Sequence, residues 1–463
     1  MPKKYCLAAL ALVVSGISVA EADQNDNSAA ATASIGASAP AAATAAAPAT
    51  PVKKARAKKA VVPLSASAPA VAPSLSAASA PAVATAATSA APATSAGKGG
   101  ADKAATPVTP ALSAEQSMFK FGGFGTLGIS HSSLSQGDYV LDSSMPKGVG
   151  RSNAWSASNT SRIAAHATAN FTPKVSAIFQ VDSEYRTDGS YRMEVEWFNV
   201  KYAFTPNLFM RVGRIALPTF MDSENRDVGY SYVWVNPPVD LYHQLSIPSS
   251  DGVDVVYRSE IGEAGNTLKG IFGKNTNERP TSVTKSKEMW GLFDTFEYGP
   301  TTLHVSYQQR WSSTENTLTG ISGGWILNRD LSVGGSYDPG EWFVISEWIQ
   351  RRSTTKINAM YVSGGYRINK FTPYLLYSQN SPGSFVPGTP TPSASAIDRA
   401  NRSQSTTSVG LRWDFMRNYD FKIQYDQVKL SDNSNGYLIN VPAGVTLYGS
   451  KFNVISAVVD FLF

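Results

Sequence analysis

The sequence has a single cysteine, four histidines and no apolar run long enough to cross a bilayer as a helix. The longest apolar run, 7–19, falls short of the roughly 20 residues that such a helix needs. Cys6 lies inside that N-terminal segment, so a mature chain without it has no disulfide and no cysteine-based metal site. These absences exclude a helical membrane bundle and a thiol enzyme.

The first 22 residues have the pattern of a secretory signal. Lys3 and Lys4 precede the apolar run, and Ala20-Glu21-Ala22 has the small-x-small form of a signal-peptidase site. We therefore expect a signal peptide at 1–22 and a mature chain that begins at Asp23 outside the cytoplasm.

Residues 23–112 consist almost wholly of Ala, Pro, Ser, Thr and Val, without aromatic residues. Such a segment cannot bury a core, so we predict a disordered periplasmic extension. Its basic residues at 53–59 either contact an anionic polymer such as peptidoglycan, lipopolysaccharide or nucleic acid, or belong to a solvated linker. From residue 113 onward, 31 basic residues balance 31 acidic ones, so the high isoelectric point belongs to the extension. The five basic residues are Lys53, Lys54, Arg56, Lys58 and Lys59.

From Met118 the composition changes to Gly, aromatic and β-branched residues in segments of about ten that alternate apolar with polar. Transmembrane strands have this length and this period of two. The pattern predicts an all-β fold for 113–463, a transmembrane antiparallel β-barrel of sixteen strands. We expect strands at 118–130, 161–171, 175–186, 193–204, 208–214, 252–258, 266–273, 288–298, 301–311, 330–337, 341–351, 356–367, 371–379, 405–416, 420–430 and 447–463.

The connections alternate in length, as barrel strands require. Five short turns contain proline, which presets a turn dihedral: Phe-Thr-Pro at 171–173, 204–206 and 371–373, Tyr-Gly-Pro at 298–300 and Asp-Pro-Gly at 338–340. The aromatic residue that opens four of them would lie at one membrane interface. Long polar connections are expected outside, at 131–160, 215–251, 274–287, 312–329, 380–404 and 431–446.

Polar members of each alternating strand must face the lumen, because Arg or Lys facing lipid costs about 2–4 kcal/mol at the midplane. Two strands break this rule. Glu194 and Glu196 fall on the predicted lipid face of 194–204, and Glu347 lies among apolar residues in 341–351. A bulge or contact with a neighbouring protomer would explain either strand. The predicted basic pore wall comprises Arg162, Lys201, Arg211, Arg258, Arg310 and Arg412.

The last strand carries an apolar face at period two that ends on Phe461 and Phe463. It resembles the C-terminal assembly signal of Gram-negative outer-membrane barrels, which implies recognition by the barrel-assembly machinery. The alternative at this point is the last strand of a soluble sandwich.

The connection 215–251 follows the fifth strand and carries acids, prolines and four aromatic residues that argue against free exposure to water. With a connection of this kind after the fifth strand, the segment 118–463 resembles Gram-negative porins of the 16-stranded general diffusion type. The loop's sequence, including Asp227-Val228-Gly229-Tyr230, does not match the inward loop of enterobacterial general porins. The predicted constriction residues are Asp222, Glu224 and Asp227, facing Arg162, Lys201 and Arg211.

The resemblance implies a water-filled outer-membrane channel for passive diffusion of small hydrophilic solutes and ions. It also implies a homotrimer in contact with lipid bilayer and lipopolysaccharide, with no catalysis and no cofactor. Two alternatives stay open: a tether that joins the outer membrane to the cell wall through the basic extension, and an outer-membrane barrel enzyme such as a lipase or protease. The four histidines, His131, His166, His243 and His304, stand in no Gly-x-Ser-x-Gly or His-Glu-x-x-His motif.

Overall fold

A computed structural model describes residues 117–142, 145–244, 247–279, 281–381, 383–391 and 401–463. The predicted signal peptide, the predicted extension 23–112 and its basic residues lie outside the described residues.

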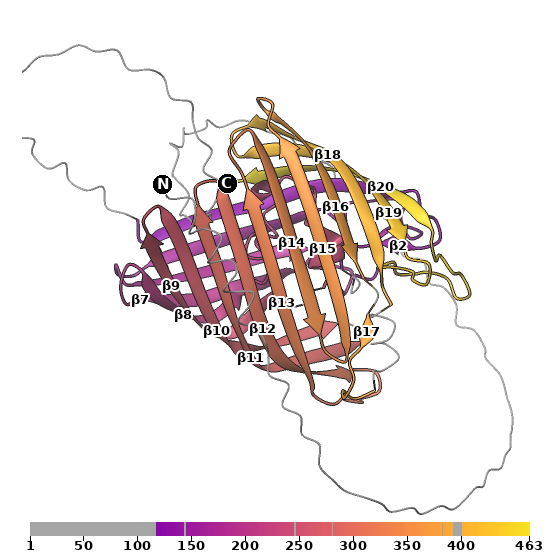
Figure 1. Ribbon diagram of the computed structural model, residues 1–463, viewed down its shortest axis with the longest axis horizontal. Helices are drawn as coiled ribbons and strands as arrows, with labels where there is room; N and C mark the ends of the chain where they lie inside the picture. The colour runs from indigo at the N-terminus through magenta and orange to yellow at the C-terminus, as the bar shows by residue number, and fades with distance from the viewer. Residues whose placement is uncertain (1–116, 143–144, 245–246, 280, 382, 392–400) are drawn as a thin grey trace, which may run out of the picture. The chain divides into compact units, whose positions relative to one another are not determined.

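The described chain forms a closed antiparallel ring of sixteen long strands, as the sequence predicts (Figure 1). Each strand pairs with the next along the chain, and β1 closes the ring by pairing with both β5 and β20. The barrel strands are β1 (Phe119–Ser132), β5 (Arg162–Asn170), β6 (Val175–Glu184), β7 (Met193–Ala203), β8 (Leu208–Ala216), β9 (Ser249–Ile261), β10 (Ala264–Arg279), β11 (Ser282–Tyr298), β12 (Thr301–Asn316), β13 (Ile326–Tyr337), β14 (Trp342–Arg352), β15 (Thr355–Tyr366), β16 (Phe371–Asn380), β18 (Gln404–Met416), β19 (Tyr419–Leu430) and β20 (Lys451–Leu462).

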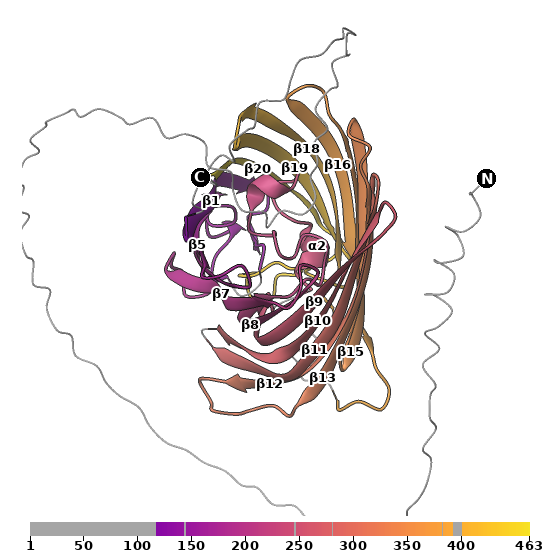
Figure 2. The same ribbon diagram turned by 90° about the vertical axis from the view of Figure 1, so that its left-hand side faces the viewer.

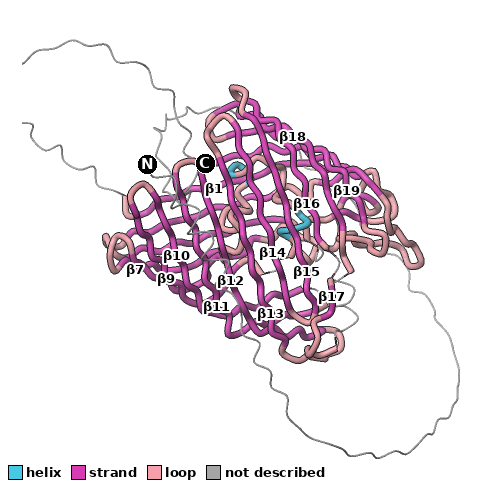
Figure 3. The backbone as a smooth tube through the Cα atoms, viewed as in Figure 1, coloured by secondary structure: helices cyan, strands magenta, loops and turns pink. Residues whose placement is uncertain are grey.

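Six small elements lie in the connections (Figure 3). Four are two-residue strands and two are single turns of helix. No helix in the described ranges is long and apolar enough to cross a bilayer. The small elements are β2 (Asp138–Tyr139), β3 (Val149–Gly150), β4 (Trp155–Ser156), η1 (Gly229–Ser231), α2 (Val239–Tyr242) and β17 (Ser384–Phe385).

The outer face of the barrel is apolar and the inner face polar. Along β19, Ile423 and Tyr425 are exposed, whereas the alternate residues Lys422 and Gln424 are buried inside. The other strands alternate in the same way, with large apolar side chains exposed around the ring. This is the reverse of a soluble protein and is typical of a barrel in lipid, so the soluble-sandwich alternative is wrong.

Two of the predicted proline turns share one geometry. The Oγ1 atoms of Thr172 and Thr205 each accept a hydrogen bond at 3.0 Å from the backbone N–H three residues later, which closes the turn. The third copy of this sequence was predicted to be a turn, and that prediction is wrong. Phe371-Thr372-Pro373 begins β16, and the reversal lies at 367–370, where Asn369 has a φ of 54°. Proline is tolerated at the start of a strand, so the motif alone does not fix the turn.

Two predicted long connections are shorter in the structure. Strand β10 continues to Arg279, and strand β11 already begins at Ser282. The predicted connection 274–287 is therefore wrong, and only 280–281 remain between these two strands. Likewise β12 continues to Asn316, which leaves 317–325 of the predicted 312–329. These extensions are polar on both faces, so they lack the alternation that marks a strand in lipid.

A β-bulge explains the two glutamates of β7. Gln180 pairs with Trp197 but Val181 pairs with Val195, so Glu196 is an extra residue and the side-chain direction reverses there. Glu194 therefore faces the lumen, where it pairs with Arg186 at 3.3 Å. The placement of these glutamates on the lipid face was wrong, and the alternative of a bulge is confirmed.

Candidate pore constriction

The connection 217–248, here called the inward loop, joins β8 to β9, and its described residues 217–244 lie inside the barrel with η1 and α2 (Figure 2). Hydrogen bonds tie the loop to distant parts of the wall. On β12, the Ser306 hydroxyl donates to the carbonyl of Thr219 at 2.8 Å. On β15, the Ser363 hydroxyl accepts a bond of 2.8 Å from the Trp234 indole. The loop therefore crosses the lumen rather than standing outside it.

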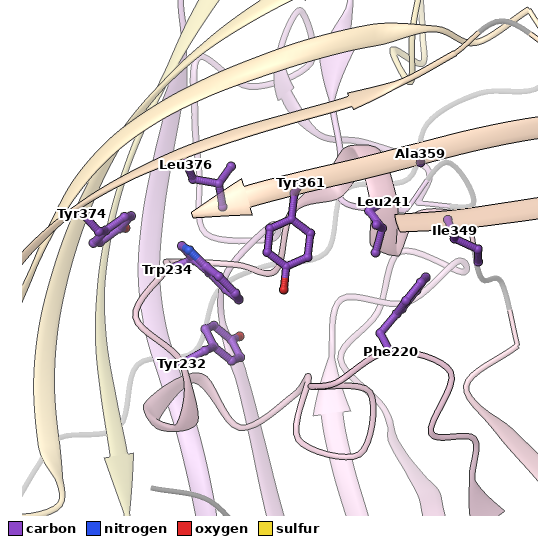
Figure 4. Close-up of a cluster of buried hydrophobic side chains, with 9 residues drawn as sticks. All are labelled: Phe220, Tyr232, Trp234, Leu241, Ile349, Ala359, Tyr361, Tyr374 and Leu376. Carbon is purple, nitrogen blue, oxygen red and sulfur yellow. The ribbon is translucent and has the colours of Figure 1, made fainter. Parts of the chain in front are cut away.

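An apolar cluster holds the middle of the inward loop against β14, β15 and β16 (Figure 4). Burial of large aromatic side chains dominates the energetics of such a contact. The cluster explains why β14 turns apolar side chains inward, because the loop covers them. The cluster residues are Phe220, Tyr232, Trp234 and Leu241 from the loop, and Ile349, Ala359, Tyr361, Tyr374 and Leu376 from the strands.

Glu347 lies within this covered part of the wall and not against lipid. Its carboxylate accepts hydrogen bonds from the Tyr361 hydroxyl at 2.7 Å and from the backbone N–H of Met221 at 3.1 Å. Neither a bulge nor a neighbouring protomer is needed to explain this residue, since the inward loop supplies its partners.

A second anchor holds η1 against β18, β19 and β20. The Lys422 ammonium donates to the carbonyl of Gly229 at 2.6 Å and pairs with Asp460 at 3.0 Å, and both charged side chains are fully buried. Arg412 donates to the carbonyls of Tyr230 and Tyr232 at 2.9 and 3.0 Å. Arg412 thus fixes the loop instead of lining an open part of the wall.

The loop segment 222–227 is arranged differently, because its own charged side chains stay partly exposed where they pair with Arg162, Arg211 and Lys269 of the wall. Glu224 of the loop pairs with Lys269 of β10 at 2.5 Å and with Arg211 of β8 at 3.7 Å. Its side chain is 38% exposed. Burial raises the pKa of Glu224, but Lys269 and Arg211 lower it by more, so the carboxylate stays ionised with a pKa below 4.5.

Three residues further on, Asp227 pairs with Arg162 of β5 at 3.1 Å and with its neighbour Arg226 at 3.5 Å. Burial raises the pKa of Asp227, and the two guanidinium groups outweigh it, so the net pKa is lowered. Arg226 in turn lies near the carboxylates of Glu184 and Glu196, which contribute to its raised pKa. Side chains of Asp227 and Arg226 are 26% and 30% exposed.

Four of the predicted site residues thus come together in two pairs, Glu224 with Arg211 and Asp227 with Arg162. Sequence reasoning missed Lys269, Arg226, Glu184 and Glu196. Lys269 could have been found, because it occupies a lumen position of an alternating strand. Glu196 could not, because the bulge hides its direction.

The other predicted residues lie elsewhere. Asp222 is half-buried near Glu347, and no basic side chain in the described part of the chain pairs with it. Burial raises the pKa of Asp222 to about 6. Lys201 and Arg258 lie over the ring of Phe209, at 4.2 and 5.5 Å from its centre. Arg310 is buried against Asp330 at 2.6 Å.

The described residues hold no cluster of three His, Cys, Asp or Glu side chains that could bind a metal ion. Three histidines bond to backbone carbonyls: His131 to Ala154, His243 to Leu141 and His304 to Pro218. These contacts are structural in character.

No protein-family model matches the chain, and no curated protein sequence matches it. The solved structures to which the chain is similar include the following three, at 12–14% identity. Outer-membrane expressed OmpT of Vibrio cholerae matches over 76% of this chain and 99% of its own, with a TM-score of 0.48. An anion-selective porin from Comamonas acidovorans matches over 74% and 99%, with a TM-score of 0.48. The outer membrane channel DcaP of Acinetobacter baumannii matches over 74% and 97%, with a TM-score of 0.47.

Similarity of this degree concerns the fold alone. The barrel's own features are more direct: a closed, even-numbered antiparallel ring, only short turns at one end, all the long loops at the other, and an apolar outer face. The described chain is therefore a transmembrane antiparallel β-barrel of sixteen strands, an architecture that bacterial outer-membrane barrels share.

Proposed function

We propose that the barrel is a passive channel for small hydrophilic solutes and ions, constricted between the loop segment 222–227 and the wall formed by β5 to β10. One observation carries this proposal. Charged side chains of that loop segment are partly exposed, including Glu224, Arg226 and Asp227, whereas Lys422, Asp420 and Asp460 of β19 and β20 are fully buried. Partly exposed charges inside a barrel need water beside them, because burying a charge without water or a full set of partners is costly.

Both signs of charge are present at the proposed constriction. This pattern supports a channel that orients solutes, in preference to a channel that rejects all ions of one sign. Glu224 faces cations, while Arg226 faces Glu184 and Glu196. Opposed charges across a narrow passage create a transverse field, which orders dipolar solutes and screens them by charge.

The cell-wall tether and the homotrimer are separate proposals, which the constriction does not support. A cell-wall tether depends on the basic residues at 53–59, and a homotrimer depends on the resemblance to porins. The enzyme alternative has no catalytic motif to support it.

Single-cysteine probing in planar bilayers tests the proposed passage. A Cys6→Ser background has no other cysteine, so one thiol can be placed at will. In Asp227→Cys, a bulky charged thiol reagent should lower the single-channel conductance by more than half. In the matched control Asp338→Cys, in the short turn at 338–341, the same reagent should leave conductance unchanged. Unaltered conductance after verified labelling at position 227 would contradict the proposed passage.

A further inference from the structure

A small cavity lies between the inward loop and the barrel wall, and it shares no lining residue with the loop segment 222–227. Its volume is about 20 Å³, and its lining comes mainly from the loop segment 235–239 and from β1, β16, β18, β19 and β20. A single water molecule or ion needs roughly 10–15 Å³. The cavity therefore has room for about one particle of this size, and not for an ion with its hydration shell.

Two buried carboxylates at this cavity have no positive partner. Asp426 of β19 lines the cavity and is 5% exposed, and its Oδ1 atom accepts a hydrogen bond from the Gln424 amide at 2.7 Å. Asp240 of α2 is fully buried and accepts a bond of 2.6 Å from the hydroxyl of Ser378, which also lines the cavity. Among the described residues, no Lys, Arg or His side chain forms an ion pair with either carboxylate.

Other fully buried acids of the lumen wall have a cation beside them. Asp330 pairs with Arg310 at 2.6 Å. Asp460 pairs with Lys422 at 3.0 Å. A charge buried without a counter-charge is costly, so the folded protein either protonates such a carboxylate or binds a cation next to it.

The lining of the cavity favours a cation over a proton, because it offers oxygen atoms that lack a donor. Nδ2 of Asn159 donates to the carbonyl of Tyr139 at 3.0 Å, which fixes the amide orientation. Oδ1 of Asn159 is buried and has no hydrogen-bond partner among the residues that the structure describes. Pro237 and Pro238 line the cavity and have no backbone N–H to donate. A proton on Asp426 satisfies one oxygen at most, whereas a hard cation is coordinated by several oxygens at once.

We propose that this cavity binds one monovalent cation of the size of Na⁺, with the Asp426 carboxylate and Oδ1 of Asn159 among its ligands. A single carboxylate lines the cavity, so one positive charge balances it. Asp426 belongs to the wall, whereas Pro237 and Pro238 belong to the inward loop, so the ion lies between the two and stabilises the docked loop. The site does not depend on whether the channel conducts.

The test measures thermal unfolding of the purified full-length protein in detergent at pH 8.5. NaCl replaces N-methylglucamine chloride in steps at constant ionic strength, so that general screening stays equal. The unfolding temperature of the wild type should rise with Na⁺ and saturate after about 2 °C or more, because an ion that binds only the folded state stabilises it. KCl should give less than half of this rise, since the cavity is small.

Three variants locate the effect. Asp426→Asn keeps the side-chain shape and removes the charge, so its unfolding temperature should be the same in both salts. Asn159→Ala removes one oxygen and should need about tenfold more Na⁺ for half of the rise. The matched control is Glu347→Gln, which changes another buried carboxylate of the wall that is bonded to neutral groups such as Tyr361 but does not line the cavity. It should keep the full response to Na⁺.

The width of the ²³Na resonance is a second readout, which does not depend on how far a variant is destabilised. The wild type should broaden this resonance more than Asp426→Asn at equal protein concentration. Equal unfolding temperatures of the wild type in Na⁺ and N-methylglucamine would overturn the proposal. So would a full Na⁺ response in Asp426→Asn or its loss in the control. If Asp426→Asn is more stable than the wild type by the same amount in both salts, the cavity holds only water and the proposed cation site is wrong.

Discussion

Asp222 differs from the other acids of its loop segment because burial, and not a nearby cation, determines its ionisation. Its pKa is raised from 3.8 to about 6. A folded-state pKa above the unfolded value means that the folded protein holds the proton more tightly, so ionisation destabilises the fold as pH rises from about 4 to 6. The substitution Asp222→Asn should therefore raise the thermal unfolding temperature at pH 8 and leave it unchanged at pH 3.5. An equal shift at both pH values would show that the charge is not responsible.

Glu224 and Asp227 should have the opposite pH dependence, because nearby cations lower the pKa of each carboxyl group below its free value. Their contribution to stability is present above the unfolded pKa and is lost as pH falls through the lower folded pKa. The variant Glu224→Gln should thus have a lower thermal unfolding temperature than the wild type at pH 7. In strong acid the two unfolding temperatures should converge. A difference in unfolding temperature between variant and wild type that persists at pH 2 would contradict the assigned ion pairs.

For the individual residues of the proposed constriction, the sequence predicted only part of the arrangement. The alternation of β5 and β8 indicated that Arg162 and Arg211 face the lumen, and the structure brings them to Asp227 and Glu224. The direction of Glu196 depended on a bulge with no sequence signature. The separation of Asp222 from the cations depends on how the loop packs, which no local pattern encodes.

Among the elements, the inward loop depends on close contact at one glycine. A Cβ atom on Gly229 would lie 1.9 Å from Oδ1 of Asp460 and 2.5 Å from Oγ1 of Thr126. Gly229→Ala should therefore push η1 away from the wall, weaken the bond from Lys422 and make the channel noisier in single-channel recordings. The control is Gly324→Ala in the connection 317–325, where an added Cβ meets no atom within 4 Å. Identical open-channel noise in the two variants would argue against this anchor.

The strands themselves were predictable where lipid imposes alternation on them. All sixteen expected segments overlap a barrel strand. The errors occur where strands leave the apolar belt: the outer parts of β10, β11 and β12 are stabilised by polar cross-strand pairs such as Thr284 with Thr314, joined by a 3.0 Å hydrogen bond. Polar pairs of this kind are equally compatible with a loop, so composition could not separate the two.

For the whole molecule, closure of the ring rests on β1 and β20. The backbone of Phe463 exchanges hydrogen bonds of 2.9 and 3.0 Å with Gly123, and the rings of Phe461 and Phe463 cover Gly125 and Gly123. The substitution Phe463→Ala should lower the yield of heat-modifiable barrel in outer-membrane fractions several-fold. Phe385→Ala, an equally exposed phenylalanine in β17, should not. Equal yields from both variants would remove the assembly role predicted for the last strand.

Ion selectivity in planar bilayers tests the central claim most directly, because it reports the charges that line the narrowest passage. Glu224→Gln/Asp227→Asn should move the zero-current potential in a salt gradient toward anion preference. Arg162→Gln/Arg211→Gln/Lys269→Gln should move it toward cation preference. Both shifts should be largest at low salt, where screening is weakest. If both variants keep the wild-type reversal potential at low salt, solutes do not pass between the loop segment 222–227 and the wall, and the proposed constriction is wrong.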